Sequence, residues 1–361
     1  MRSAVLTDLA ALSIVAITLL PAACETPEAP KEVSMDAAPV ESAKAEPATA
    51  EPAPSVEVSP RLLRRFQPLP EAVPPASPVE AARVDLGRKL FHDKSLSSDG
   101  SVACSTCHDL SRFGADGRAT SLGVGGQQGP RNAPTVYNAG AQFRMFWDGR
   151  AADLEEQAKG PILNPREMGM SDGDAVAKRL AASPAYRTLF TKAFPEASPA
   201  VSFDNYAIAV AAFERTLVTR GRWDKFLEGD QSALTLEEKR GLKTFLNAGC
   251  MVCHTGKMLG GSMYERVGVV EPWPNQTDPG RYAVTKDEGD RMMFKVPTLR
   301  NVAETAPYFH DGSAKSLDDA VRMMGKHQLG LDLAPDETTA IVAWLKSLTG
   351  ALPKQPADTA L

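Results

Sequence analysis

Apolar side chains recur at helical spacing in two long stretches, and each stretch therefore predicts an amphipathic helix. The first runs from Pro78 to Phe91, and the second runs from Phe203 to Val218, where Ser202 can cap the N-terminus. A break at Arg220-Gly221 follows the second helix. The residues on the two apolar faces are Val79, Ala82, Leu86 and Leu90 in the first helix and Tyr206, Val210, Phe213 and Leu217 in the second.

Shorter helices are predicted by their start and stop signals. Thr235 and Glu238 form a capping box for a helix that runs to Asn247, with Gly249 just beyond it. Strand signals are few, so the pattern predicts a mainly α fold. The other predicted helices are Asp174–Ala182, a helix from Ser316 with Asp319 through Met324, and a last one that carries Ile341, Trp344, Leu345 and Leu348 and stops at Gly350.

The N-terminal region has the pattern of a targeting segment. Ala10–Leu20 is an apolar run of signal-peptide length, too short for a permanent membrane span, and small residues precede the lone Cys24. We expect residues 1–24 to be a lipoprotein-type signal peptide with Cys24 acylated, because an unpaired cysteine is a liability in an oxidising compartment. The alternative is ordinary cleavage nearby, which leaves Cys24 as a spare thiol. Both predict export to the periplasm.

Composition divides the rest of the chain. Residues 25–60 are mostly Pro, Ala and Glu and cannot bury enough apolar surface to fold, so we expect an extended tether. The remaining length is enough for two domains, which we place at residues 61–220 and 221–352. The net charge of −5 gives no electrostatic reason to expect nucleic acid as a partner. Membrane contact is expected only through the lipid anchor.

Two copies of the pattern Cys-x-x-Cys-His carry the clearest chemistry, at Cys104–His108 and Cys250–His254. Two thiols one turn apart can each add to a vinyl group of one porphyrin, and the next histidine can ligate the iron. The two copies use four of the five cysteines. They predict two covalent c-type haems, attached through Cys104, Cys107 and His108 and through Cys250, Cys253 and His254, and hence two cytochrome-c-like helical domains.

Three other interpretations of the cysteine pairs are weaker. A zinc site does not explain why each pair ends in histidine. A thioredoxin-like redox pair lacks its βαβ surroundings, and a structural disulfide is strained at this spacing. A haem that only passes electrons needs both axial positions filled. A haem that reduces peroxide needs one open position and a proton donor above it.

With both motifs placed, the chain resembles the bacterial dihaem cytochrome c peroxidases, a family that includes the MauG-type enzymes. The match runs from about Leu86 to Gly350. The strings that carry the resemblance are Gly129–Thr135 (GPRNAPT), Phe146–Ala151 (FWDGRA), Glu156–Pro161 (EQAKGP), Leu299–Val302 (LRNV), Thr305–His310 (TAPYFH) and Met323–Gly325 (MMG).

The resemblance implies that Met324 is the sixth ligand of the second haem, which would accept electrons. His–Met ligation raises the reduction potential and suits that role. Met323 and His327 are rival ligands nearby, and Met324 could instead be core packing.

The first haem carries a departure from the family pattern. Most relatives have a histidine in the glycine-rich region Gly114–Gly129 that closes this haem at rest, and Val124 stands in its place here. That region is expected to lie over the haem face opposite His108. Our hypothesis is that the first haem is five-coordinate at rest. The alternatives are water or another side chain as ligand, of which His92 and Met145 are conceivable.

The resemblance also implies the acid–base groups. Gln157 and Glu167 match the positions that line the peroxide pocket, Pro161 shapes it, and Glu167 can move a proton between the peroxide oxygens. Burial near Met168 would raise the pKa of Glu167. The alternative for Glu167 is an ordinary solvated carboxylate. Trp147 matches a tryptophan placed between the two haems, and it could equally be a structural indole.

A calcium site between the domains is implied by the same match. Asn132, Thr305 and Pro307 correspond to the protein ligands, the last two through backbone carbonyls. His310 matches a histidine near the second haem, but an ordinary core histidine is equally consistent with the sequence. We do not include it among the ligands.

The predicted reaction is therefore reduction of hydrogen peroxide to water at the His108 haem. The expected donor is a small periplasmic cytochrome c or cupredoxin, which delivers electrons to the His254–Met324 haem. One rival is a MauG-like enzyme that oxidises a protein substrate, although those relatives have tyrosine at the Met324 position. The other rival is a non-catalytic dihaem electron carrier. By analogy with relatives, the chain is expected to form a homodimer.

Overall fold

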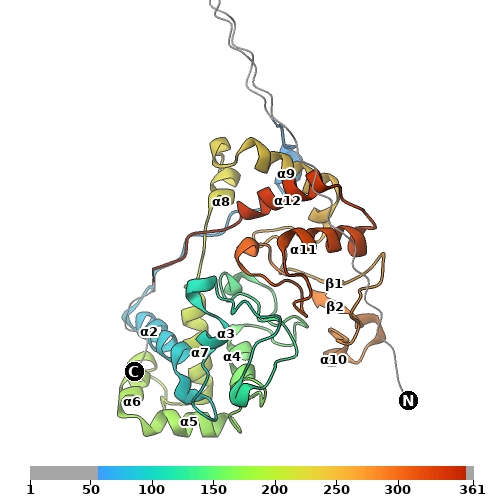
Figure 1. The fold of residues 1–361 in the computed structure, drawn as a ribbon. Helices are drawn as coiled ribbons and strands as arrows, with labels where there is room; N and C mark the ends of the chain where they lie inside the picture. Colours follow the sequence, from blue (N-terminus) through green and yellow to red (C-terminus); the bar gives the residue numbers. More distant parts are fainter. Residues whose placement is uncertain (1–55, 355–361) are drawn as a thin grey trace, which may run out of the picture. The chain divides into compact units, whose positions relative to one another are not determined.

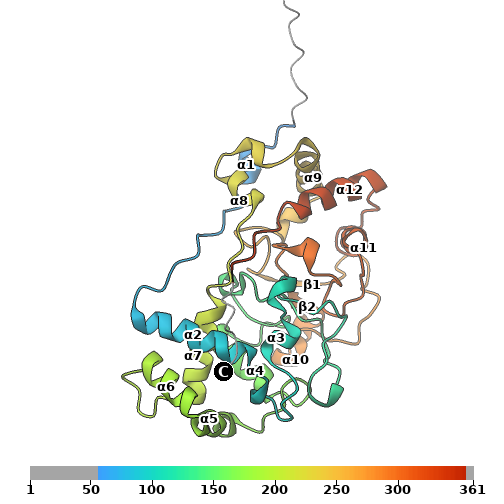
Figure 2. The ribbon, with the colours of Figure 1, turned by 60° about the vertical axis from the view of Figure 1, so that its left-hand side comes forward.

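Two pairs of crossing helices organise the computed structural model, which describes residues 56–354. In the N-terminal half, α2 (Pro78–His92) packs against α7 (Phe203–Glu214). In the C-terminal half, α9 (Leu236–Asn247) packs against α12 (Pro335–Lys346). Both pairs lie side by side in the two views (Figure 1 and Figure 2). The fold is mainly α, as the sequence predicts.

A glycine permits the close approach of the helices in each pair. A Cβ built on Gly87 of α2 would lie 1.8 Å from the carbonyl oxygen of Ala209 in α7. A Cβ built on Gly241 of α9 would lie 1.8 Å from the carbonyl oxygen of Ala340 in α12. Any side chain at either position would force the helices apart. The same packing solution occurs in both halves, which supports two helical domains of one architecture.

Shorter elements complete the structure, and several short 3₁₀ turns lie between them. The two strands pair antiparallel, with Glu265 opposite Phe294. The other helices are α1 (Pro60–Leu63), α3 (Cys104–Cys107), α4 (Leu154–Leu163), α5 (Gly173–Ala182), α6 (Pro184–Ala193), α8 (Arg222–Leu227), α10 (Tyr282–Thr285) and α11 (Leu317–Met323), and the strands are β1 (Tyr264–Arg266) and β2 (Met293–Lys295).

Separate apolar cores form in the two halves, and the ends of the described chain cross between them. The largest core of the N-terminal half is built around α2 and α7, and that of the C-terminal half around α9 and α12. Phe66 packs into the C-terminal core, although it precedes α2 in sequence. Leu352, beyond α12, packs near Phe91 and Tyr137 of the N-terminal half. The N-terminal segment therefore packs on the C-terminal half, and the C-terminal segment packs on the N-terminal half.

One predicted helix end is wrong. The helix predicted from Phe203 to Val218 ends at Glu214. The chain leaves the helix because Asn138 binds it elsewhere: the Asn138 amide donates to the Leu217 carbonyl at 2.7 Å, and the Asn138 Oδ1 accepts from the Thr219 amide at 2.9 Å. The helix predicted through Met324 is α-helical to Met323 and continues from Met324 as a π-helical turn.

The predicted signal peptide, Cys24 and nearly all of the predicted tether lie outside the described residues. Within residues 56–354, no helix is long and apolar enough to cross a membrane.

Candidate dihaem active site

The first Cys-x-x-Cys-His motif forms a single helical turn, α3, that places both thiols and the histidine together. The Thr106 hydroxyl accepts from the Ala103 amide at 2.9 Å, and the His108 amide donates to the Cys104 carbonyl at 2.9 Å. His108 Nδ1 lies 3.2 Å from the Gly114 carbonyl oxygen, so this nitrogen carries the proton. Burial lowers the pKa of His108 and keeps the ring neutral, which leaves Nε2 with a lone pair for iron.

The second motif repeats this arrangement at His254. Its Nδ1 lies 3.0 Å from the Leu259 carbonyl oxygen, and burial lowers its pKa in the same way. None of the four motif cysteines forms a disulfide in the described part of the chain, so all four sulfurs are available for thioether bonds. The donor sets at both motifs fit covalent haem, with thiols for the vinyl groups and a neutral imidazole for iron.

A cavity of about 50 Å³ lies at the first motif. Cys104, Cys107 and His108 line it together with Gln157 and Glu167, and Pro161 also contributes to its wall. The structure thus brings the predicted acid–base residues onto the cavity of the first haem motif, across more than fifty positions of sequence.

Helix α4 and the turn that follows it position these groups. Gln157 and Pro161 stand four residues apart on α4 and so share a face. In the following turn the Asn164 carbonyl accepts from the Glu167 amide at 2.9 Å, and the Asn164 Nδ2 donates to Glu167 Oε1 at 2.6 Å. Asn164 therefore fixes both the backbone and the carboxylate of Glu167, a positioning role that the sequence did not reveal.

Glu167 is buried enough for its acidity to change. Desolvation raises the pKa of Glu167, and the charge of Arg150 and the hydrogen bond from Asn164 oppose that rise. The direction agrees with the expectation from sequence. A carboxyl group with a raised pKa gives and takes protons more readily near neutral pH.

The loop that contains Val124 packs directly on the turn that carries Glu167. The Val124 amide donates to the Glu167 carbonyl at 2.9 Å, and Val124 is 6 % exposed. A Cβ on Gly123 would lie 2.1 Å from the Arg166 carbonyl oxygen, so only glycine permits this approach. Among the described residues that line this cavity, neither His92 nor Met145 is found.

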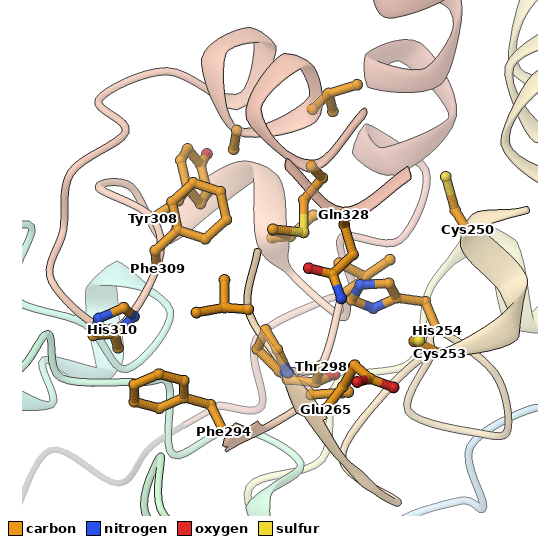
Figure 3. A pocket seen from close by; sticks show the side chains of 18 of the residues that line it. Cys250, Cys253, His254, Glu265, Phe294, Thr298, Tyr308, Phe309, His310 and Gln328 are labelled. Atoms are coloured by element: carbon orange, nitrogen blue, oxygen red, sulfur yellow. The ribbon is translucent and has the colours of Figure 1, made fainter. Parts of the chain in front are cut away.

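The second motif lies on a much larger cavity of about 490 Å³, in the size range of cofactor sites. Cys250, Cys253, His254 and Met324 all line it. Figure 3 shows the two cysteines and His254 at one side and Phe294 with His310 at the other. The lining is mainly apolar, as a porphyrin face requires.

Met324 reaches this cavity because the helix geometry changes at its position. It begins the π-helical turn η9 (Met324–Leu329) directly after α11. Met323 and Met324 both pack against the cluster around Trp273, but Met323 also packs into the core around α9 and α12. His327 Nδ1 lies 3.3 Å from the Glu271 carbonyl oxygen. Neither Met323 nor His327 is among the residues that line the cavity in the described part of the chain.

Trp147 lies at the junction of the two halves. Its indole Nε1 donates to the Asn132 carbonyl at 2.9 Å, and its ring meets that of His310 edge-on, with centroids 6.3 Å apart. His310 also stacks on Phe294 at 4.2 Å. Trp147 and His310 both line the second cavity. The indole is therefore both a packed structural group and a wall of the second haem site.

Comparison with known proteins agrees with this arrangement. Residues 81–232 match the family model for di-haem cytochrome c peroxidase. The chain is 48% identical over 297 residues to the cytochrome c551 peroxidase of Pseudomonas aeruginosa, which covers 80% of this chain and 85% of the relative. The chain belongs to the dihaem cytochrome c peroxidase family.

Other members of the family show how wide it is. The methylamine utilization protein MauG of Methylorubrum extorquens is 38% identical, over 69% of this chain and 70% of the relative. A solved structure of a MauG-like protein associated with microbial copper homeostasis is 32% identical, with a TM-score of 0.68, over 78% of this chain and 95% of that one. Membership makes this chain an oxidoreductase with two c-type haems.

The residues expected to bind calcium in this dihaem peroxidase lie on one cavity. Asn132, Thr305 and Pro307 all line the second cavity. The Asn132 Nδ2 donates to the Arg118 carbonyl at 2.9 Å, which leaves Oδ1 as the side-chain atom for a cation. Within residues 56–354, no cluster of three or more His, Cys, Asp or Glu side chains is placed to hold a metal ion.

Sequence reasoning missed a second carboxyl group at the first haem motif. Glu214 lies on α7, lines the same cavity as Glu167 and is 5 % exposed. Burial raises the pKa of Glu214 to about 8, with Arg215 lowering it and Glu155 raising it. The sequence did contain a signal for Glu214. It stands four residues after Val210 and so shares the helix face of that residue, which also lines the cavity.

Proposed function

We propose that this peroxidase reduces hydrogen peroxide to water at the His108 site. A small exported redox protein, a cytochrome c or a cupredoxin, would deliver the electrons at the His254–Met324 site. The observation that carries the proposal is the convergence of Gln157 and Glu167 on the cavity of His108. A proton-transfer group within the site of a haem that has an open axial position is what peroxide cleavage needs and simple electron transfer does not.

The protein groups then have distinct tasks. Reduction of one hydrogen peroxide to two water molecules consumes two electrons and two protons. The haems, when bound, supply the redox chemistry. Glu167 moves a proton from one peroxide oxygen to the other, and the raised pKa of its carboxyl group suits this transfer. The Gln157 amide orients the peroxide, and Pro161 forms part of the cavity wall.

We further propose that no protein side chain closes the first haem at rest. Val124 has no lone pair to offer, and its backbone is bound to the Glu167 carbonyl. The loop from Ser121 to Gly129 is closed on itself by the hydrogen bond from the Gly129 amide to the Ser121 carbonyl at 2.8 Å. A closed, packed loop without histidine supports an enzyme that needs no reductive opening.

The remaining expectations belong to the same proposal. The exported chain would act in the periplasm, held to a membrane through acylated Cys24. Calcium would bind at Asn132, Thr305 and Pro307, and two copies of the chain would form a homodimer.

The test is peroxide turnover by the fully oxidised holoprotein, with a reduced small cytochrome c as donor. We expect turnover without pre-reduction, and one high-spin and one low-spin signal in the electron paramagnetic resonance spectrum. Val124→His should convert the high-spin signal to low-spin and impose a need for pre-reduction, whereas the matched control Val124→Leu should not.

Other outcomes would point to the rival functions. Two low-spin signals with no peroxide turnover, while Glu167 is intact, would support a non-catalytic electron carrier. Slow turnover of the cytochrome with peroxide-dependent oxidation of a protein substrate would support a MauG-like enzyme. Full activity of oxidised Val124→His would contradict our account of the loop.

A further inference from the structure

Lys295 is a buried cation whose surroundings contain no carboxylate partner within the described residues. It lies on β2, is 7 % exposed and lines the second cavity. Its ammonium donates to Gln142 Oε1, a neutral group from the N-terminal half of the chain. Burial alone lowers the pKa of Lys295 to about 8, and no nearby acid opposes this shift.

Two other cations with little exposure do have carboxylate partners. Arg300 pairs with Asp224 at 2.8 Å, and both side chains are 1% exposed. Arg131 pairs with Asp148 and with Asp278, each at 2.6 Å. A buried charge is costly unless it is paired, so an ammonium held in an apolar cavity by one amide indicates a missing anion.

The same cavity presents a second donor without a partner. Arg300 lines it, and Nη2 of Arg300 is buried with no hydrogen-bond acceptor among the described residues. Lys295, Arg300 and Arg266 therefore all line a cavity of about 490 Å³, to which Glu265 contributes one carboxylate. That carboxylate does not affect the pKa of Lys295, which burial alone lowers. The haem expected there carries two carboxylates, its propionates, at the ring edge opposite the vinyl groups.

The positions of the cysteines determine which way that edge points. Thioether bonds hold the vinyl edge at Cys250 and Cys253, at one side of the cavity in Figure 3. Phe294, the residue before Lys295 on β2, is at the other side. A haem attached through these cysteines would therefore have its propionate edge on the side of the cavity where β2 carries Lys295.

We propose that Lys295 is the counter-ion of a propionate of the second haem, with Gln142 holding its ammonium in position. The propionate would compensate the positive charge of the buried Lys295 ammonium. The ion pair would also hold the edge of the haem that lies opposite the two cysteines. A positive charge beside the ring also favours the reduced state of the haem, which suits a group that receives electrons. This assignment rests on the second c-type haem and not on the donor or the resting state of the first haem.

The experiment is a spectroelectrochemical titration of the second haem in the holoprotein. Lys295→Met should lower the equilibrium constant for its reduction at least tenfold, which corresponds to about 59 mV for one electron. Lys295→Arg keeps the charge and should stay within about threefold of wild type. The exposed Lys346→Met is the matched control and should not change it.

An unchanged potential in Lys295→Met, with full haem content, would overturn the assignment. If Lys295→Met does not yield holoprotein, Lys295→Gln replaces it. We expect the same drop in the reduction potential, and an unchanged potential would again overturn the assignment. In wild-type protein, an infrared band of a protonated propionic acid of the second haem at neutral pH would also contradict the pair. If wild-type protein shows no peroxide turnover, the proposed function is refuted instead. The expected effect of Lys295→Met on the reduction potential of the second haem does not depend on that result.

Discussion

The two haem motifs share their backbone and differ in the charges around them. Each histidine donates Nδ1–H to a nearby carbonyl, and each half crosses two helices at a glycine. The first cavity, however, is lined by two carboxyl groups, Glu167 and Glu214, and by no Lys or Arg among the described residues. The second is lined by three cations, Lys295, Arg300 and Arg266, and by one carboxylate, Glu265. The same architecture therefore surrounds the two haem motifs with different charges, as the proposed division between a proton-handling site and an electron-receiving site requires.

The direction of the pKa shifts makes the same distinction. Burial raises the pKa of both Glu167 and Glu214, so the first site holds groups that can carry a proton near neutral pH. At the second site Met324 faces the cavity, and a thioether neither gives nor takes a proton. The difference teaches that the fold positions a haem, whereas the residues beside it decide its task.

The largest effect should come from removing the acid of the first site. Glu167→Gln should reduce peroxide turnover by about 10²–10⁴-fold, because the proton transfer loses its carrier. Both haem absorption spectra should remain nearly unchanged. Stopped-flow turnover with a reduced cytochrome measures the loss, and the exposed Glu196→Gln is the matched control. Wild-type rates in Glu167→Gln would remove this residue from the mechanism.

A smaller effect is expected from the ligand of the second site. Met324→Leu should lower the equilibrium constant for reduction of the second haem at least tenfold, about 59 mV, because a thioether ligand favours the reduced iron. Its long-wavelength methionine-to-iron absorption band should disappear. Met323→Leu is the matched control, since Met323 does not line the cavity. If the band disappears only in Met323→Leu, Met323 and not Met324 is the ligand of the second haem.

The smallest effect concerns stability. The pKa of Glu214 is raised from 4.5 to about 8 by burial, so between these values the folded protein binds the proton and the unfolded chain does not. Its contribution to stability is therefore fully present below pH 4.5 and is lost as the pH rises towards 8. In Glu214→Gln, the fall of unfolding free energy with pH should be less steep by up to about 1.4 kcal/mol per pH unit.

Denaturant unfolding of the holoprotein at a series of pH values measures this slope. Glu155 and Arg215 are the charged neighbours of Glu214, and Arg215→Gln separates their influence from that of burial. Identical slopes for wild type and Glu214→Gln would mean that Glu214 is ionised in the folded protein.

Much of the helical framework follows from local signals. Ser202 caps α7 and Thr235 forms the capping box of α9, as predicted. Helix α6 was missed although Ser183 caps it and Pro184 occupies its first position, so its signal was present. Helix α4 was missed for a physical reason, because Pro161 stands inside it and normally ends a helix.

The candidate site was predictable where spacing carries the chemistry. Cys-x-x-Cys-His identifies haem attachment because both thiols and the imidazole must come from one turn of chain. The roles given to Gln157, Glu167 and Met324 depended on resemblance, and the cavities then showed where these side chains lie. Asn164 was not predictable, because its hydrogen bonds to Glu167 depend on how the turn after α4 folds back.

By itself, the sequence determined that the chain carries two c-type haems on a mainly helical framework, because both properties depend on residues close together in the chain. Only the tertiary structure decided which charges face each cavity. Glu214 lies more than a hundred residues from Cys104, and Lys295 meets Gln142 across the two halves. Burial, and hence pKa and the need for a counter-ion, is a property of the packed molecule, and no local pattern of residues contains it.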